Sequence, residues 1–149
     1  MRALLDTSYF VATESGRPLG EMVGVTETEV SVVTLAELTV GVLMADDDDR
    51  SARVATLSAV ESTWDPLPID AEVARQFARI AAALRAGGHR VPILDALVAA
   101  TAIVEQIPVV TQDNDYEAIP GVQVIRVYHR SRRPGPSALI RSRSSGKFE

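Results

Sequence analysis

The sequence predicts an α/β domain of three layers, α/β/α, in which helices cover both faces of a mostly parallel central sheet. The alternation of two kinds of segment predicts it. Short apolar runs typical of buried strands alternate with longer helix-like stretches, and the runs lie at residues 2–5, 29–33, 67–69, 109–111 and 122–127. Such alternation is typical of parallel sheets, because each crossover between parallel strands lays a helix on one face. The 149 residues are enough for one domain with its own core, and they show no internal repeat.

Helices are expected where apolar residues recur at helical spacing, and these stretches lie at 9–14, 35–45, 51–63, 71–86 and 92–106. Thr7 or Ser8 is the expected cap of the first helix. Thr34 and Glu37 have the spacing of a capping box, which predicts the start of the second helix. Asp70 directly precedes the fourth helix and is its expected cap.

One stretch, PILDALVAATAI at 92–103, is almost wholly apolar and carries a single charged residue, Asp95. A helix of this composition is normally buried, and a carboxylate on it is costly unless a partner neutralises its charge. Pro92 fits the first helical position. The stretch therefore predicts a buried helix whose Asp95 finds a cation elsewhere in the fold.

Three further acids stand where strands end or helices begin. Asp6 follows the first strand, Glu37 lies just beyond the second, and Asp113 follows the strand at 109–111. The carboxyl ends of parallel strands share one edge of a sheet, so these acids and Asp95 are expected to converge there. Carboxylates in close contact repel one another, and a divalent cation removes the conflict. Oxygen ligands favour a hard ion, which predicts Mg²⁺, with Mn²⁺ as the alternative.

Each acid also has a plainer structural interpretation. Asp6 fits a loop after a strand, Asp113 and Asp115 fit a turn, and Asp95 fits a helix N-terminus, where the dipole favours an anion. Glu37 has the most direct one, because a capping box turns its side chain back to the backbone. The sequence leaves open whether Glu37 caps its helix or binds metal.

Metal-assisted hydrolysis of a phosphodiester is the reaction that suits a centre built from carboxylates alone. The chain has no cysteine and only two histidines, His89 and His129, so a zinc site is disfavoured. A metal-dependent phosphatase or a phospho-accepting receiver domain on a similar sheet is also disfavoured. A receiver needs a lysine late in its fold, and the only lysine here is Lys147 in the C-terminal tail.

Four motifs, LLDTS, TLAEL, PILDALVAATA and VVTQDNDY, resemble in order and spacing the signature of PIN-domain ribonucleases. The similarity is greatest to the VapC toxins of bacterial VapBC toxin–antitoxin pairs, and it covers residues 2 to 127. It implies a PIN-like domain over residues 1–129 with Mg²⁺-dependent endonucleolytic cleavage of RNA, often a structured RNA of the translation machinery. It also implies a homodimer that a cognate VapB-type antitoxin inhibits. The alternative is an inactive PIN-like module that binds RNA or protein.

The resemblance also implies roles for individual residues. The acids that match the family's catalytic and metal-binding set are Asp6, Glu37, Asp95 and Asp113. Asp115 matches an additional, more variable metal-binding acid. The hydroxyls with a supporting role around the acids are Thr7, Ser8 and Thr111. Leu94 and Gln112 stand where the family often has a polar and a basic residue, so they bear on substrate contact. The RNA target and the number of metal ions stay open.

Charge is unevenly spread along the chain, whose net charge is −5. Residues 130–149 hold six of the fifteen Lys and Arg residues and one of the twenty acids, and they are rich in Ser, Gly and Pro. This composition predicts a disordered basic tail, either a nucleic-acid-binding arm or an added expression sequence. No apolar run reaches the length of a membrane span. Asp6 interrupts the apolar N-terminal stretch that an export signal needs, so a cytoplasmic location is expected.

Overall fold

The computed structural model describes residues 1–127, and the predicted tail at 130–149 lies outside this range. Its centre is a sheet of four strands: β1 (Arg2–Leu5), β2 (Glu27–Val30), β3 (Val109–Thr111) and β4 (Val124–Arg126). All three pairings are parallel, in the order β2-β1-β3-β4, which confirms the predicted sheet. The strand expected at 67–69 is reduced to one parallel bridge, between Ser31 and Leu67.

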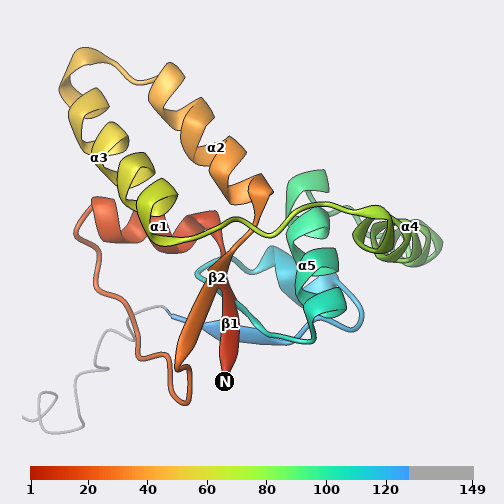
Figure 1. Cartoon of the computed structure of the whole chain (residues 1–149). Coiled ribbons are helices and arrows are strands. Elements are labelled where there is room, and N and C mark those ends of the chain that lie inside the picture. The colour runs from red at the N-terminus through yellow and green to blue at the C-terminus, as the bar shows by residue number, and fades with distance from the viewer. Residues whose placement is uncertain (128–149) are drawn as a thin grey trace, which may run out of the picture.

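The helices that connect the strands are α1 (Thr7–Glu14), α2 (Val32–Leu43), α3 (Asp47–Thr63), α4 (Ala71–Ala86) and α5 (Ile93–Glu105), with a short 3-10 helix, η1 (Asp115–Ala118). In Figure 1, α2 and α3 form a hairpin that extends beyond the sheet, while α4 lies beside α5. In this part of the chain no helix is long and apolar enough to cross a membrane.

Alternation along the strands divides the core between two faces of the sheet, because successive side chains of a strand point to opposite sides. Leu4 and Val109 pack with buried residues of α4 and α5. Leu5 and Val110 pack on the other side with Phe10 of α1 and with residues of α2 and α3. The predicted three-layer α/β/α architecture is therefore confirmed.

The start of α2 differs from the prediction. Ser31 is its N-cap, and the Ser31 Oγ accepts a hydrogen bond of 3.3 Å from the backbone N–H of Thr34. Thr34 and Glu37 both lie inside the helix, so the predicted capping box is wrong. The second strand stops at Val30 for the same reason, since the chain turns into the helix three residues earlier than expected.

Other helix ends were predicted with mixed success. Asp70 caps α4 as expected, with its Oδ1 accepting from the backbone N–H of Val73 at 2.9 Å. Asp6, rather than Thr7 or Ser8, occupies the N-cap position of α1, and its side chain makes no capping bond. Pro92 stands one residue before the first helical residue of α5.

The strand order creates a switch point between β1 and β3. After β1 the chain forms β2 on one side of it, and later places β3 on the other side. In open parallel sheets such a point leaves a crevice at the carboxyl ends of the strands, where ligands bind. Asp6 follows β1 directly and Asp113 follows β3 by two residues, so the topology brings both acids to this crevice.

Candidate metal centre

Asp6 is the most deeply buried acid of the centre. Its side chain is 4% exposed and accepts three hydrogen bonds from hydroxyl groups. Ser8 Oγ and Thr111 Oγ1 each donate to Oδ2 at 2.9 Å, and the Tyr116 hydroxyl donates to Oδ1 at 2.9 Å. Buried polar groups need such partners, and here both carboxylate oxygens have them. The carboxylate of Asp6 is therefore held in one orientation without a cationic partner.

Three acids next to Asp6 form a cluster whose oxygen atoms lie within 4.8 Å of one another: Asp95, Asp113 and Asp115. Asp95 comes from the first turn of α5, Asp113 from the loop after β3, and Asp115 from the start of η1. The loop is folded on itself, because the Asp113 N–H donates to Thr111 Oγ1 at 2.9 Å and the Asp115 N–H donates to Asp113 Oδ1 at 3.1 Å. One oxygen from each acid is close enough to share a single ion.

Glu37 projects from the second turn of α2 and is partly buried. Its Oε1 accepts a hydrogen bond of 2.8 Å from Thr7 Oγ1, at the start of α1. Burial raises the pKa of the Glu37 carboxyl, the Thr7 hydroxyl opposes this shift, and the charge of Asp6 adds to it. Because Ser31 caps the helix, the Glu37 side chain is available to the centre.

Asp95 is the acid of the centre whose pKa is raised most clearly. Burial and then the negative charges around it raise the pKa of Asp95 from 3.8 to about 7, and the contributing acids are Asp6, Asp113, Asp115 and Glu37. Within residues 1–127, none of these five acids forms an ion pair with a basic side chain. Carboxylates crowded in this way hold a proton or a metal ion. Their oxygen donors fit a hard divalent cation.

The hydroxyls expected to support the acids all lie among them. Thr7 contacts Glu37, and Ser8 and Thr111 contact Asp6 and lie 3.1 Å from each other. Ser8 Oγ also accepts from the backbone N–H of Gln112 at 3.0 Å, which ties the start of α1 to the loop after β3.

Tyr116 is the residue of the centre that the sequence did not reveal. It is fully buried in η1, and burial together with the charge of Asp6 raises the pKa of its hydroxyl, which therefore stays a donor. An aromatic residue after the last acids was the only signal, and nothing in the sequence shows that its ring reaches back to β1.

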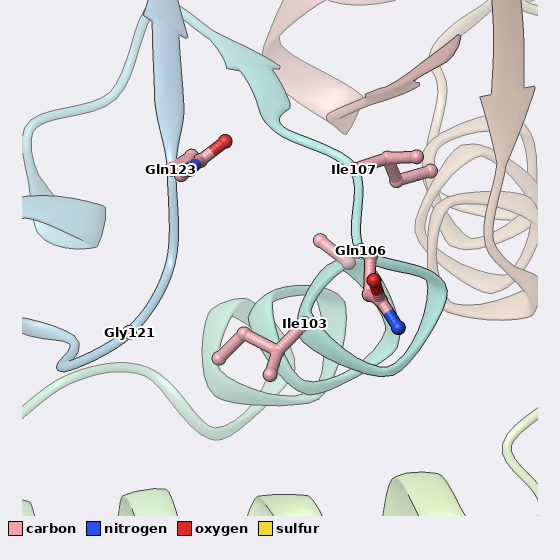
Figure 2. Close-up of a pocket in the computed structure, with 6 residues that line it drawn as sticks. Ile103, Gln106, Ile107, Gly121 and Gln123 are labelled. Atoms are coloured by element: carbon pink, nitrogen blue, oxygen red, sulfur yellow. The ribbon is translucent and has the colours of Figure 1, made fainter.

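Figure 2 shows a hollow between the end of α5 and the segment that leads into β4. It has a volume of about 340 Å³ and is lined in part by Ile103 and Gln106 near the end of α5, and by Gly121 and Gln123 before β4. Its polar lining is neutral and carries no acid. It lies at the amino ends of β3 and β4, so it is separate from the metal centre.

Comparison with known proteins fits this geometry. The family model of the PIN domain matches residues 3–122. The chain belongs to the PIN-domain family. Its relatives include two proteins of Mycobacterium tuberculosis: ribonuclease VapC5 is 47% identical over 128 residues, which cover 83% of this chain and 94% of that protein. Ribonuclease VapC4 is 43% identical over 126 residues, covering 85% of this chain and 97% of that protein. At these identities and coverages the chain is of the VapC type within that family.

Solved structures show the same PIN fold. The crystal structure of VapBC-5, a toxin–antitoxin system of Mycobacterium tuberculosis, contains a chain with a TM-score of 0.74 and 40% identity, covering 86% of this chain and 98% of that one. A chain of the DNA-bound VapBC of Salmonella typhimurium has a TM-score of 0.72 at 24% identity, covering 85% and 98%, and supports the fold alone.

Proposed function

We propose that this PIN domain is a Mg²⁺-dependent endoribonuclease that hydrolyses RNA phosphodiester bonds as the toxin of a type II toxin–antitoxin system. The observation that carries the proposal is the cluster of Asp95, Asp113 and Asp115 beside Asp6 and Glu37, which lacks a protein cation in the described residues. Mn²⁺ has the same preference for oxygen ligands and is the alternative ion.

In this proposal Asp95, Asp113 and Asp115 hold the ion, and Asp6 and Glu37 complete its surroundings. A divalent cation bound there would activate a water molecule for attack on the phosphodiester and would neutralise charge on the phosphate. The hydroxyls do the positioning: three of them fix the Asp6 carboxylate, and Thr7 fixes that of Glu37. Because the protein groups are already oriented, little reorganisation is needed when the ion and RNA bind.

The partners proposed for this chain follow from its relatives. A cognate VapB-type antitoxin is supported by the structural similarity to VapBC complexes. The family resemblance further supports a homodimer, a cytoplasmic location and a structured RNA of the translation machinery as substrate.

The test is cleavage of a labelled total-RNA pool by the purified full-length protein. We expect cleavage with Mg²⁺, none with EDTA, and none for Asp95→Asn. Asp65→Asn is the matched control, since Asp65 is an exposed acid outside the centre. Asp95→Asn is a cleaner test than Asp6→Ala, because removal of the Asp6 carboxylate leaves buried hydroxyls without an acceptor.

Two outcomes would contradict the proposal. Full Mg²⁺-dependent activity of a correctly folded Asp95→Asn protein would show that Asp95 is not a catalytic metal ligand. RNA binding without cleavage of any RNA by the wild-type protein favours the alternative, an inactive PIN-like binding module.

A further inference from the structure

A further concave site adjoins the first turn of α5, the turn that carries Asp95. We call it the α4–α5 pocket: a cavity of about 460 Å³ between the C-terminal half of α4, the 87–92 connection and the first turn of α5. Its volume is within the range of small-ligand sites, about 300–1,000 Å³. Buried and partly buried apolar side chains line its interior, and they include Phe77, Leu84 and Ala96. Its exposed rim carries the basic side chains Arg85, His89 and Arg90, together with the exposed Ile93.

The pocket and the acid cluster share the first turn of α5. Ile93 and Ala96 line the pocket, whereas Asp95 between them belongs to the cluster. Successive residues of a helix point about 100° apart, so this turn presents one face to α4 and another to the strand ends. A nucleic-acid strand with one phosphate at the acids therefore has its adjoining nucleotide within reach of the pocket.

The basic rim is shaped by the end of α4. The backbone N–H of His89 donates to the carbonyl of Leu84 at 2.9 Å, which folds the connection back onto the helix. Gly88 has a φ of +70°, a conformation that glycine adopts without strain. A Cβ at position 87 would lie 3.0 Å from Cδ2 of His89, so Gly87 leaves room for the imidazole at the rim.

The charges of the rim are available to a ligand. Within residues 1–127, neither Arg85 nor Arg90 forms an ion pair with an acid of the protein. Two unpaired guanidinium groups beside a cluster of acids are complementary to phosphates that flank a cleavage site. Guanidinium planes and aromatic rings also stack on unpaired bases, and the pocket offers both through its arginines and Phe77.

We propose that the α4–α5 pocket binds one unstacked nucleotide of the RNA, next to the phosphate that is cleaved. The base enters the apolar interior, and Arg85 and Arg90 contact the flanking phosphates. This inference rests on the proposed nuclease function, and it means that the enzyme acts where a nucleotide is free of base pairing. A base-paired helix cannot present its base in this way.

The charge part of the proposal is tested by RNA binding. The probe is a short, labelled single-stranded RNA, and its affinity for the full-length protein is measured by fluorescence anisotropy across a salt series, in an Asp95→Asn background that prevents cleavage. For Arg85→Gln/Arg90→Gln we expect at least about a tenfold weaker affinity and a salt slope reduced by about two. Arg75→Gln/Arg79→Gln is the matched control on α4, since both arginines are exposed and lie outside the pocket lining.

The base part is tested by filling the pocket without changing charge. Ala81 lines the pocket, and Ala81→Leu adds volume there. Leucine has a high helix propensity, so the substitution should leave α4 intact. We expect this variant to bind the RNA more weakly with an unchanged salt slope, and to bind an abasic oligoribonucleotide like the background protein. Cleavage by the matching variants with intact Asp95 should fall in the same order.

The results separate this inference from the nuclease proposal. If the wild-type protein cleaves RNA and all pocket variants bind and cleave normally, the subsite is wrong and the nuclease stands. If the pocket variants instead change the oligomeric state in sedimentation and keep RNA affinity, the pocket is a contact between copies, which also overturns the inference. If the wild-type protein cleaves nothing, the nuclease proposal fails, while weaker RNA binding by the pocket variants still supports the subsite.

Discussion

The hydroxyl of Tyr116 donates a 2.9 Å hydrogen bond to Oδ1 of Asp6, which lies 110 residues earlier in the chain. Thr111 donates to the other oxygen of the same carboxylate. The loop at 112–115, which carries Asp113 and Asp115, is thus attached to Asp6 at both of its ends. Asp6 therefore organises the site even though it lies outside the group of three acids that can share one ion.

Tyr116→Phe tests this attachment, because it keeps the buried ring and removes only the donor. We expect the variant to unfold at a lower temperature, with a loss of about 1–2 kcal/mol, since a buried carboxylate oxygen loses its partner. Loss of a group that orients the surroundings of a metal typically lowers metal affinity or activity about 10-fold to 100-fold. Thermal unfolding and calorimetric titration with Mg²⁺ measure the two effects.

Tyr9→Phe is the matched control, because the Tyr9 ring packs edge-on against Phe10, outside the acids. It should leave metal affinity unchanged. A Tyr116→Phe protein with wild-type metal affinity would show that the loop holds its acids in place without Tyr116.

The start of α2 gives a second prediction, in which two substitutions act in opposite directions. Ser31→Ala removes the N-cap and should cost about 1 kcal/mol of unfolding free energy. Glu37→Gln should raise the melting temperature of the metal-free protein at alkaline pH, because it removes a carboxylate whose pKa is raised in the folded state. The glutamine oxygen can still accept from Thr7. Differential scanning calorimetry with EDTA compares the variants, and a destabilised Glu37→Gln protein would show that the Glu37 carboxylate stabilises the folded state.

The start of α2 could not be predicted from the sequence, whereas the sheet and its helical layers could. Periodicity and strand–helix alternation predicted a mostly parallel sheet and helical layers on both of its faces, because these follow from which residues must be buried. Thr34 and Glu37 have the right spacing for a cap, but so does Ser31 with Thr34, and only the point where β2 ends decides between them. Local spacing does not contain that tertiary information.

For the candidate site, the sequence likewise predicted the general location and not the detailed contacts. The convergence of the acids was expected because a carboxylate in an apolar helix, such as Asp95, needs a cation, and because strand ends meet at one edge, whereas their role as metal ligands stays a prediction. The hydrogen bonds of Tyr116 and Thr7 could not be predicted from the sequence. Their partners lie far away along the chain, and only the packing of the folded protein brings them together. The α4–α5 pocket was missed for the same reason, because its basic rim lies in a connection that carries no motif.

The raised pKa of Asp95 predicts that protons compete with the metal. At pH values below about 7 the carboxyl is increasingly protonated, so the apparent affinity for Mg²⁺ should fall up to about tenfold for each unit of pH. Binding near neutral pH should release protons, which calorimetry detects by repeating the titration in buffers of different ionisation enthalpy. Asp95→Asn should show weak binding without proton release. Wild-type binding that is independent of pH between about 6 and 8 would show that no proton, on Asp95 or on another group, competes with the metal in this range.

The same pKa also makes the stability of the metal-free protein depend on pH. The Asp95 carboxyl binds its proton more tightly in the folded state, where its pKa is about 7, than in the unfolded state, where it is near the ordinary value of 3.8. Between these two values the folded protein holds more protons, so the unfolding free energy falls as pH rises through this window and levels off above it. Thermal unfolding with EDTA across the window should show this fall, and Asp95→Asn should reduce it. Added Mg²⁺ should restore stability at alkaline pH, since an ion that binds only the folded state stabilises it. A wild-type protein whose melting temperature rises with pH across the window would contradict the assignment.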